Sequence, residues 1–405
     1  MRESNAKGMG LYIHIPFCVS KCAYCDFLSF EGMGRDIHER YVRALVREMQ
    51  YTRGHGGYCT ASSETSPPLY DTVYIGGGTP TALPPPLLCA ILQEVQQFNL
   101  APNAEITLEM NPSTNQLASL ASYACLGINR LSIGLQAWQD EFLRGLRRSH
   151  TSTEFIETMQ AARAAGICNI NVDLMFGLPW QSLWHWRESI TQVLACKPTH
   201  ISAYSLTPAE DTPLWDALEA GKIKLPSQTS DRAMYHEAIH MLSKAGYEHY
   251  ELSNFAKPGY ESKHNTNCWL REPYVGLGLG AHSFNGDRRW RNTMDMGRYL
   301  GVWGSPTSDM TQQSEGMAHP INTHEDVEIL TQRDAMAEAM FLGLRMTKGI
   351  KLQDFYRNFG QQLTECFGHE LKMLTAKGLI TCTAENIALT PLGLDLANQV
   401  FEAFV

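Results

Sequence analysis

The sequence predicts an α/β fold in which six β/α units form a parallel sheet or open barrel, followed by a helical, winged-helix-like C-terminal domain. Short β-branched or aromatic runs alternate with helix-length segments up to about residue 206. After that point the alternation fades, and the C-terminal part contains helical patterns around a candidate hairpin. The chain has 405 residues, more than the roughly 250–300 that one hydrophobic core usually serves, so we expect more than one domain.

The first half of the chain supplies the β/α units. The predicted strands are residues 11–17, 72–75, 105–109, 130–136, 169–176 and 200–206. The predicted helices between them are residues 36–51, 85–98, 114–126, 153–165 and 182–195, and residues 54–68 form a predicted surface loop. The carboxyl ends of parallel strands lie at one edge of a sheet or barrel, and the active sites of such barrels lie at this edge. We therefore expect the polar or special residues at these ends to meet: Cys18, Gly76–Thr79, Glu109, Gln136 and Asp173.

The second half is predicted to hold three further parts. A helix over residues 229–245 precedes an aromatic, polar stretch and the glycine-rich residues 276–280. Residues 304–324 read as a polar linker, and beyond it residues 325–346, 352–358, 361–377 and 391–404 are predicted helices around a hairpin at 379–389. The predicted domains are a core barrel (1–225), a barrel extension (226–303), the linker (304–324) and the C-terminal helical domain (325–405).

Composition and charge narrow the classes of function. The formal net charge is −9, which argues against nucleic acid as a partner, because binding a phosphate backbone needs a basic face. The cysteine count is 11, an odd number that favours a reducing compartment over a disulfide framework. The first ten residues have no apolar core of a signal peptide, and no run reaches the roughly 18 apolar residues of a membrane helix. We expect a cytoplasmic protein.

Three closely spaced cysteines form a candidate metal-binding or redox site. Cys18, Cys22 and Cys25 have the spacing C-x3-C-x2-C directly after the first predicted strand. Three close thiolates can hold three corners of an iron–sulfur cubane, and the fourth iron then stays open to another ligand. A structural zinc site would need a fourth cysteine or histidine nearby, and a redox dithiol would use Cys22 and Cys25 alone. The spacing and the position after a strand favour the open cluster.

The residues around the cysteines match a known family. The segments Tyr-Ile-His-Ile-Pro-Phe-Cys (residues 12–18) and Cys-Ala-Tyr-Cys-Asp-Phe (22–27) resemble the radical S-adenosylmethionine (SAM) enzymes. The resemblance implies a partial (β/α)6, TIM-like barrel and a [4Fe–4S] cluster held by Cys18, Cys22 and Cys25. It further implies that SAM binds the open iron and is cleaved after electron transfer from the reduced cluster.

The same resemblance implies a set of SAM contacts. A glycine-rich turn lets backbone groups approach a zwitterion, carboxylates can bind ammonium or ribose groups, and arginine offers a planar fork to a carboxylate. The implied contacts are Tyr12, Gly77, Gly78, Thr79, Glu109, Gln136, Arg148 and Asp173. At the arginine position, the neighbouring Arg147 is an open alternative.

Two details separate branches of the family. HemN-type coproporphyrinogen oxidases have the cysteine pattern C-x3-C-x2-C-x-C, whereas this chain has Asp26-Phe27 after the third cysteine. These oxidases also carry an N-terminal extension, whereas this chain has about ten residues before the first predicted strand. The residues Asp26-Phe27 are similar to the HemW group of haem chaperones, and both features count against porphyrinogen decarboxylation. Segments 250–258, 264–269, 278–283 and 340–349 also resemble that group.

The HemW-like resemblance implies that the chain binds haem and delivers it to an acceptor protein. Its candidate haem ligands are His264 and Cys268, and Cys268 stands where the family motif has a tyrosine. His282 is an alternative contact. Packing at a domain junction is the competing role of His264 and Cys268. The competing functions are a HemN-like oxidase, a radical SAM methyltransferase and a structural metalloprotein. The acceptor, a peripheral membrane association and the choice between monomer and dimer stay open.

Overall fold

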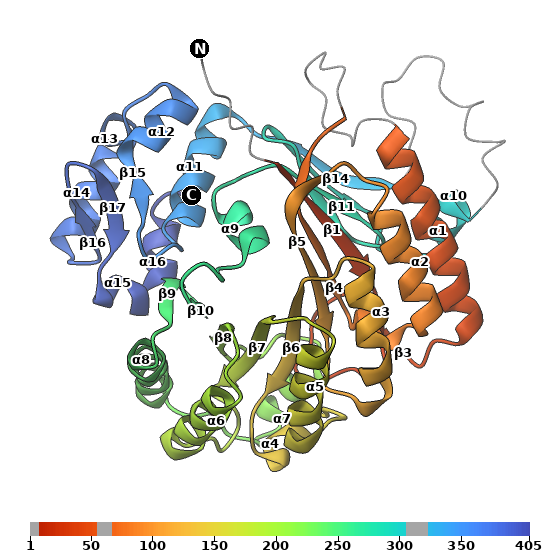
Figure 1. The fold of residues 1–405 in the computed structure, drawn as a ribbon. Coiled ribbons are helices and arrows are strands. Elements are labelled where there is room, and N and C mark those ends of the chain that lie inside the picture. Colours follow the sequence, from red (N-terminus) through yellow and green to blue (C-terminus); the bar gives the residue numbers. More distant parts are fainter. Residues whose placement is uncertain (1–7, 55–66, 305–322) are drawn as a thin grey trace.

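The computed structural model describes residues 8–54, 67–304 and 323–405 (Figure 1). Its main element is a twelve-stranded sheet with the order β14-β13-β12-β11-β1-β4-β5-β6-β7-β8-β10-β9. Seven neighbouring strands are parallel, and six of them belong to the predicted β/α units: β1 (Met9–Ile15), β4 (Tyr70–Gly77), β5 (Leu100–Met110), β6 (Arg130–Gln136), β7 (Asn169–Phe176) and β8 (His200–Ser205). The seventh, β11 (Tyr274–Leu277), pairs with β1. The predicted α/β class with six β/α units is therefore confirmed.

Helices cover the outer face of this curved sheet (Figure 1). They are α1 (Arg35–Gly54), α2 (Pro85–Val95), α3 (Leu120–Cys125), α5 (Ser152–Ala164), α6 (Leu183–Ala195) and α8 (Gln228–Lys244). The helix predicted at residues 114–126 divides into a 3-10 helix, Thr114–Ser119, followed by α3. Most of the predicted loop at 54–68 and of the linker at 304–324 lies outside the described residues.

The side chains of the parallel strands alternate between an apolar outer face and a polar inner face. In β7, Ile170, Val172 and Leu174 are fully buried in the core formed with the helices. Asn171 and Asp173 point to the opposite face, where they bond to polar groups of neighbouring strands. The inside of the barrel is thus lined with side chains that can bind a polar ligand.

Further strands extend the sheet at both ends. Beyond β1 lie β11 (Tyr274–Leu277), β12 (His282–Phe284), β13 (Arg288–Asn292) and β14 (His324–Ile329), and beyond β8 lie β10 (Asn254–Ala256) and β9 (Glu248–Glu251). The prediction of one helix over residues 325–346 is wrong in its first part, which forms β14. Arg291 of β13 binds Asp326 at 2.5 Å across the strand pair. The helix α11 (Gln332–Gly343) begins only after Thr331, whose side chain forms a capping box with Asp334.

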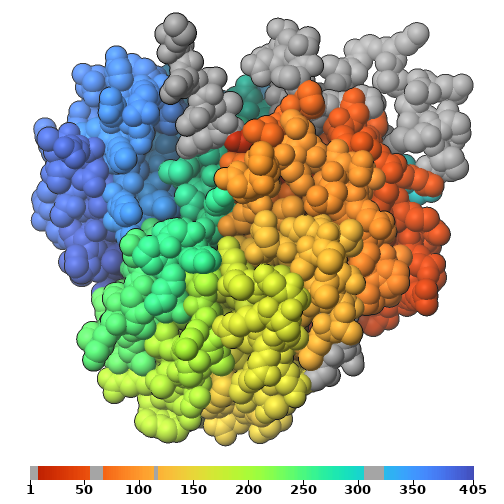
Figure 2. Space-filling model, in the orientation of Figure 1, coloured from red at the N-terminus to blue at the C-terminus, as the bar shows by residue number. Residues whose placement is uncertain are grey.

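The C-terminal part has a core of its own. Leu344, Phe355, Phe367, Leu374 and Val400 are buried together. Around them lie α12 (Leu352–Phe359), α13 (Leu363–Cys366), α14 (Gly368–Ala376), α15 (Pro391–Asp395) and α16 (Ala397–Glu402), with a small sheet of β15 (Ile350–Lys351), β16 (Ile380–Cys382) and β17 (Asn386–Leu389). The antiparallel pair of β16 and β17 confirms the predicted hairpin. Figure 2 shows this blue lobe against the green part of the chain.

The short helix α9 (Lys263–Trp269) lies between the barrel and the C-terminal lobe (Figure 1). Glu338 of α11 binds Arg271, just after α9, at 2.9 Å. The guanidinium of Arg345 lies 4.3 Å from the ring centroid of Trp269. Contacts from α11 and from the segment just after it therefore hold α9 and the residues that follow it. Of the helices in the described part of the chain, none is long and apolar enough to cross a membrane.

Candidate functional site

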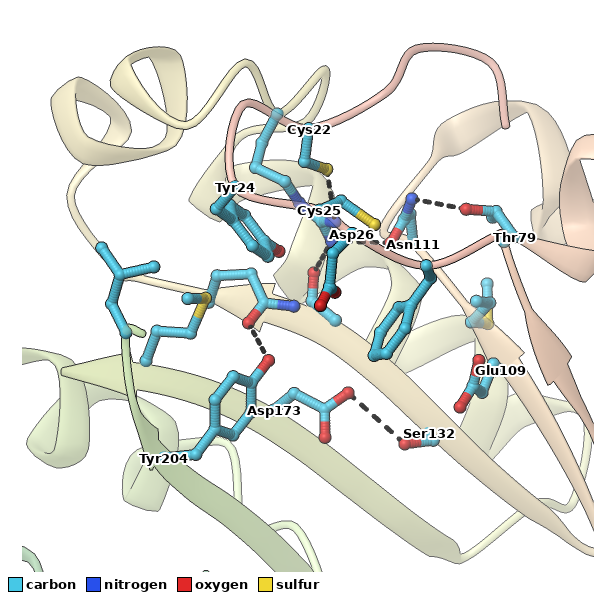
Figure 3. A pocket seen from close by; sticks show the side chains of 18 of the residues that line it. Cys22, Tyr24, Cys25, Asp26, Thr79, Glu109, Asn111, Ser132, Asp173 and Tyr204 are labelled. Carbon is cyan, nitrogen blue, oxygen red and sulfur yellow. Dashed lines mark hydrogen bonds between the residues drawn. The ribbon is translucent and has the colours of Figure 1, made fainter. Parts of the chain in front are cut away.

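The three predicted cluster cysteines lie on the loop between β1 and α1. Cys18 ends the two-residue strand β2 (Phe17–Cys18), and Cys22 and Cys25 lie in the following turn. Cys22 and Cys25 line a pocket of about 310 Å³ at the carboxyl ends of the parallel strands (Figure 3). The other lining residues are Tyr24, Asp26, Phe27, Gly78, Thr79, Glu109, Met110, Asn111, Ser132, Gly134, Gln136, Arg148, Asp173, Met175, Tyr204, Ser205, Leu206 and Thr207.

A chain of polar contacts joins the cysteine loop to the strand ends. Thr79 lies 3.7 Å from the Cys18 sulfur, and its hydroxyl accepts a hydrogen bond from Asn111 at 3.1 Å. The Asn111 carbonyl oxygen accepts from Arg148 at 2.6 Å, and Arg148 in turn lies 3.3 Å from the Cys22 sulfur. The cysteine loop is therefore fixed to β4, β5 and the segment after α4 (Asp140–Gly145) before any ligand is bound.

The glycines of the turn after β4 leave room for the cysteine loop. Gly77 has a φ of +113°, and a Cβ built on it would lie 2.5 Å from the imidazole of His14. A Cβ on Gly78 would lie 2.6 Å from the carbonyl oxygen of Phe17 and 3.1 Å from the Cys18 sulfur. A side chain at position 77 would displace His14 of β1, and one at position 78 would push the cysteine loop away from β4. This cradle therefore fits a metal cluster bound close to the backbone.

Glu109 occupies the side of the pocket next to this turn. Its Oε1 accepts a hydrogen bond from the hydroxyl of Tyr74 at 2.6 Å, and its Oε2 accepts from the Gly77 N–H at 3.2 Å. Burial, together with the charge of Asp173, raises the pKa of Glu109 to about 7, although the bonds from Tyr74 and Gly77 oppose this. The carboxyl group is thus poised to change its charge near neutral pH.

Asp173, labelled in Figure 3, and Gln136 also line the pocket. Asp173 accepts hydrogen bonds from Asn171 at 2.7 Å and from Ser132 at 3.5 Å, and its pKa is raised by burial. It lies inside β7 rather than at the strand end, which corrects that part of the sequence prediction. Gln136 does end β6, with a φ of +73°, and accepts from the hydroxyl of Tyr204 at 2.7 Å. Left-handed backbone at a non-glycine residue is a form of strain often found at functional sites.

Arg148 is the cation of the pocket. Its Nε is buried and has no hydrogen-bond partner, although its two terminal nitrogens bind Asn111, Cys22 and the carbonyl of Gly134. A guanidinium that lines a polar pocket favours an anionic ligand group such as a carboxylate. Arg147, the alternative left open by the sequence, is exposed and does not line the pocket. The structure therefore favours Arg148.

Tyr12 lies on β1 on the inner side of the barrel. Its hydroxyl is 2.9 Å from Nδ1 of His14, and Nε2 of His14 donates to the carbonyl oxygen of Leu28 at 3.0 Å. These bonds connect β1 to the far side of the cysteine loop. Six of the predicted SAM contacts line the pocket, namely Gly78, Thr79, Glu109, Gln136, Arg148 and Asp173, whereas Tyr12 and Gly77 do not.

Comparisons with known proteins place this arrangement in a family. A model of the radical SAM superfamily matches residues 12–193, and a model of the HemN C-terminal domain matches residues 330–396. The chain is 35% identical to the protein named heme chaperone HemW of Bacillus subtilis (strain 168), over 97% of this chain and 98% of the relative. The chain belongs to the HemW family of radical SAM proteins.

Other members of the HemW family and one solved structure agree. The chain is 31% identical to heme chaperone HemW of Lactococcus lactis, covering 97% of this chain and 96% of the relative. It is 30% identical to a mitochondrial radical SAM domain-containing protein 1 of Danio rerio, covering 95% and 86%. Coproporphyrinogen III oxidase (HemN) of Escherichia coli superposes with a TM-score of 0.81 at 22% identity, covering 98% of this chain and 90% of that one, which supports the fold. The predicted resemblance and fold class are therefore confirmed.

Membership of the radical SAM superfamily implies a [4Fe–4S] cluster and SAM. Within the described residues, no three His, Cys, Asp or Glu side chains are arranged to hold one metal ion. A cubane does not require such an arrangement, because each cysteine binds a different iron. Burial raises the pKa of the Cys18 and Cys25 thiols, so binding of iron would release their protons.

The HemW-family haem candidates lie at the opposite end of the barrel. His264 is on α9, with Nδ1 2.9 Å from the hydroxyl of Thr72 near the start of β4. The ring is 7% exposed and stacks on Tyr74 with 5.2 Å between centroids. Burial and the nearby Arg130 lower the pKa of His264 to about 4, and burial raises that of Cys268 to about 11. The structure brings these two residues to one helix but not to the cysteine pocket, and His282 is exposed on β12.

Sequence reasoning missed several residues that build the pocket. Asn111 bridges Thr79 and Arg148, Tyr204 holds Gln136, and Tyr74 holds Glu109. Asn111 follows Glu109 by two residues in the segment Glu-Met-Asn-Pro, so its position at a strand end was a usable signal. Tyr74 and Tyr204 lie within strands, where aromatic residues are common packing residues.

Proposed function

We propose that this chain is a radical SAM haem chaperone. In this proposal Cys18, Cys22 and Cys25 hold a [4Fe–4S] cluster, SAM binds in the adjoining pocket, and the protein binds haem and passes it to an acceptor protein. The supporting observation is that the cysteine loop and the ionisable strand-end residues share one pocket in a chain that matches proteins named heme chaperone HemW over nearly its whole length.

The pocket residues suit the parts of SAM. The carboxylate of Glu109 and the backbone beside Gly77 can bind the ammonium group, and the guanidinium of Arg148, which lines the pocket, can bind the carboxylate. Asp173, held by Asn171 and Ser132, can accept hydrogen bonds from ribose hydroxyls. A reduced cluster of this kind supplies one electron for cleavage of SAM when both are bound.

Haem binding at His264 and Cys268 requires α9 to move. The His264 imidazole is held between Thr72 and Tyr74, and the N–H groups of Lys263 and His264 donate to the carboxylate of Glu105, each at 3.2 Å. A neutral imidazole can bind haem iron, and the low pKa of His264 keeps it neutral at pH 7. Outward movement of α9 would expose both candidate ligands together.

Haem titration of the purified protein, followed by the Soret band, tests the proposal. We expect the parent to bind haem, His264→Ala to lose most of that binding, and Cys268→Ala to change the spectrum. His249→Ala is a matched control, because this histidine packs on Phe255 with centroids 4.5 Å apart and is not a candidate ligand. Absence of haem binding by the parent would overturn the haem part of the proposal.

A second measurement separates the chaperone from an enzyme. The cluster is reconstituted anaerobically, dithionite and SAM are added, and 5′-deoxyadenosine and substrate turnover are followed. Transfer of haem to a haem-free acceptor without turnover of coproporphyrinogen supports the proposal. Turnover of coproporphyrinogen, or methylation of an added substrate, would instead support the oxidase or methyltransferase functions that the sequence left open.

A further inference from the structure

The inner face of the barrel contains a column of three rings. Tyr74 of β4 stacks on Tyr12 of β1, with 6.3 Å between centroids and an interplanar angle of 28°. Tyr74 also stacks on His264 of α9, with 5.2 Å between centroids and an interplanar angle of 28°. The ring of Tyr74 is therefore held by two aromatic contacts, and the position of its hydroxyl is set before any ligand arrives.

That hydroxyl points at a group of the cofactor pocket. It donates to Oε1 of Glu109 at 2.6 Å, while the Gly77 N–H takes the other oxygen at 3.2 Å. The contact depends on the absence of a side chain at Gly76. A Cβ there would lie 2.8 Å from the Glu109 carboxyl carbon and 2.9 Å from Cε1 of Tyr74. Position 76 thus has to be glycine for the tyrosine and the carboxylate to meet.

The charged surroundings of Glu109 make this bond important. Asp173 on β7 faces Glu109 and favours its neutral form, whereas Arg130 on β6 favours the anion. Tyr12 faces Glu109 from β1 as a neutral hydroxyl, because burial holds its pKa far above neutral. A short hydrogen bond from Tyr74 stabilises the anion, which is the form that can bind an ammonium group.

We propose that Tyr74 is a positioning residue, which orients the Glu109 carboxylate and keeps it ionised so that it binds the ammonium group of SAM. This inference rests on the proposed function of the pocket. Tyr74 acts through Glu109 and contacts no cofactor itself. The chemical class that the site recognises is a primary ammonium group next to a carboxylate, since Glu109 and Arg148 line the same pocket.

The test is Tyr74→Phe in the cluster-reconstituted full chain, with the dissociation constant for SAM measured by calorimetry from pH 6 to pH 9. The variant keeps the ring and both stacking contacts but loses the hydroxyl. We expect affinity at pH 7 to fall about tenfold, because one charge-assisted hydrogen bond is lost. We also expect the pH at which affinity is half lost to rise by about one unit, because the pKa of Glu109 rises.

Two further variants make the result specific. In Glu109→Gln the pH dependence between pH 6 and 8 should disappear, and adding Tyr74→Phe to it should have little further effect on affinity. Tyr235→Phe is the matched control. This buried tyrosine lies on α8, and its hydroxyl donates to the carbonyl oxygen of Leu252 at 2.9 Å and not to Glu109. It should bind SAM as the parent does, with an unchanged pH profile.

The outcomes distinguish this inference from the proposed function. Failure of the parent to bind SAM at any pH contradicts the proposed function itself. If the parent binds SAM and Tyr74→Phe binds it equally well at every pH, then Tyr74 does not position Glu109. An equal loss of affinity in Tyr74→Phe and Tyr235→Phe would show a general effect of buried tyrosines, and would also overturn the inference. Iron content of each variant confirms that the cluster is loaded.

Discussion

The two ends of the barrel have similar polar linings, but the carboxyl end is open as a pocket and the amino end is covered by α9. At the carboxyl end, Glu109 and Arg148 line an open pocket next to the cysteine loop. At the amino end, Glu105 and Arg130 form a buried pair at 4.0 Å, and α9 covers them. The comparison teaches that a polar barrel interior is not itself a ligand site. A ligand site arises where charged side chains line an open pocket, as Glu109 and Arg148 do, and not where a helix such as α9 covers them.

The largest expected effect is at the carboxyl end, in Cys18→Ser. Loss of one of the three thiolate ligands should abolish stable cluster binding, because only two of the three cysteine ligands would remain to hold the cluster. Iron and sulfide analysis after anaerobic reconstitution measures how much cluster the variant binds. Cys125→Ser, at an exposed position on α3, is the matched control and should load the parent's amount of iron. A fully loaded Cys18→Ser variant would mean that another residue holds the cluster.

The next effect is at the amino end, in Glu105→Gln. The side chains of Glu105 and Arg130 are only 5% and 2% exposed, so removing the charge leaves a buried guanidinium without its counter-ion. We expect a loss of about 3 kcal/mol in the free energy of unfolding, measured with denaturant. Glu237→Gln, which breaks an exposed pair with Arg187, should leave that free energy nearly unchanged. Equal stability of the two variants would show that the amino end is not held by this buried pair.

The third prediction concerns pH and the unliganded pocket. The pKa of Glu109 is raised from its ordinary value of 4.5 to about 7 in the folded state, so the folded protein keeps a proton that the unfolded chain releases. The stability that this group contributes is therefore present below about pH 4.5 and is lost as pH rises to about 7. Glu109→Gln should gain stability relative to the parent across that window and remain level above it. Thermal unfolding at pH 5 and pH 8 measures the difference, and a constant difference would contradict the raised pKa.

The smallest effect links the two ends. His264→Ala removes one of the two rings that hold Tyr74, so the Glu109 carboxylate should become less well oriented. We expect SAM affinity in haem-free protein to fall about two- to threefold, in keeping with one aromatic contact. His264→Phe should restore it, because stacking needs a ring and not an imidazole. Unchanged SAM affinity in the alanine variant would show that the two ends act independently.

Local patterns predicted a large part of this structure. The period-two alternation of β7 and the apolar stripes of α1 and α6 were sufficient to place strands and helices within a few residues. The spacing of Cys18, Cys22 and Cys25 was sufficient to place them on one loop. The strand β14 was missed because its residues, His-Glu-Asp-Val-Glu-Ile, are acidic and form a strand by pairing with the arginines of β13.

The sequence by itself determined the fold class, the cysteine loop and the strand ends that approach it, because each of these depends on residues close together in the chain. The tertiary structure alone decided which groups meet. It placed Asn111 between Thr79 and Arg148, and it placed α9 at the end of the barrel away from the cysteines. These contacts join residues separated by 32, 37 and 192 positions. Local periodicity carries no information on such pairings, which are fixed by how the strands close into a barrel and what covers its ends.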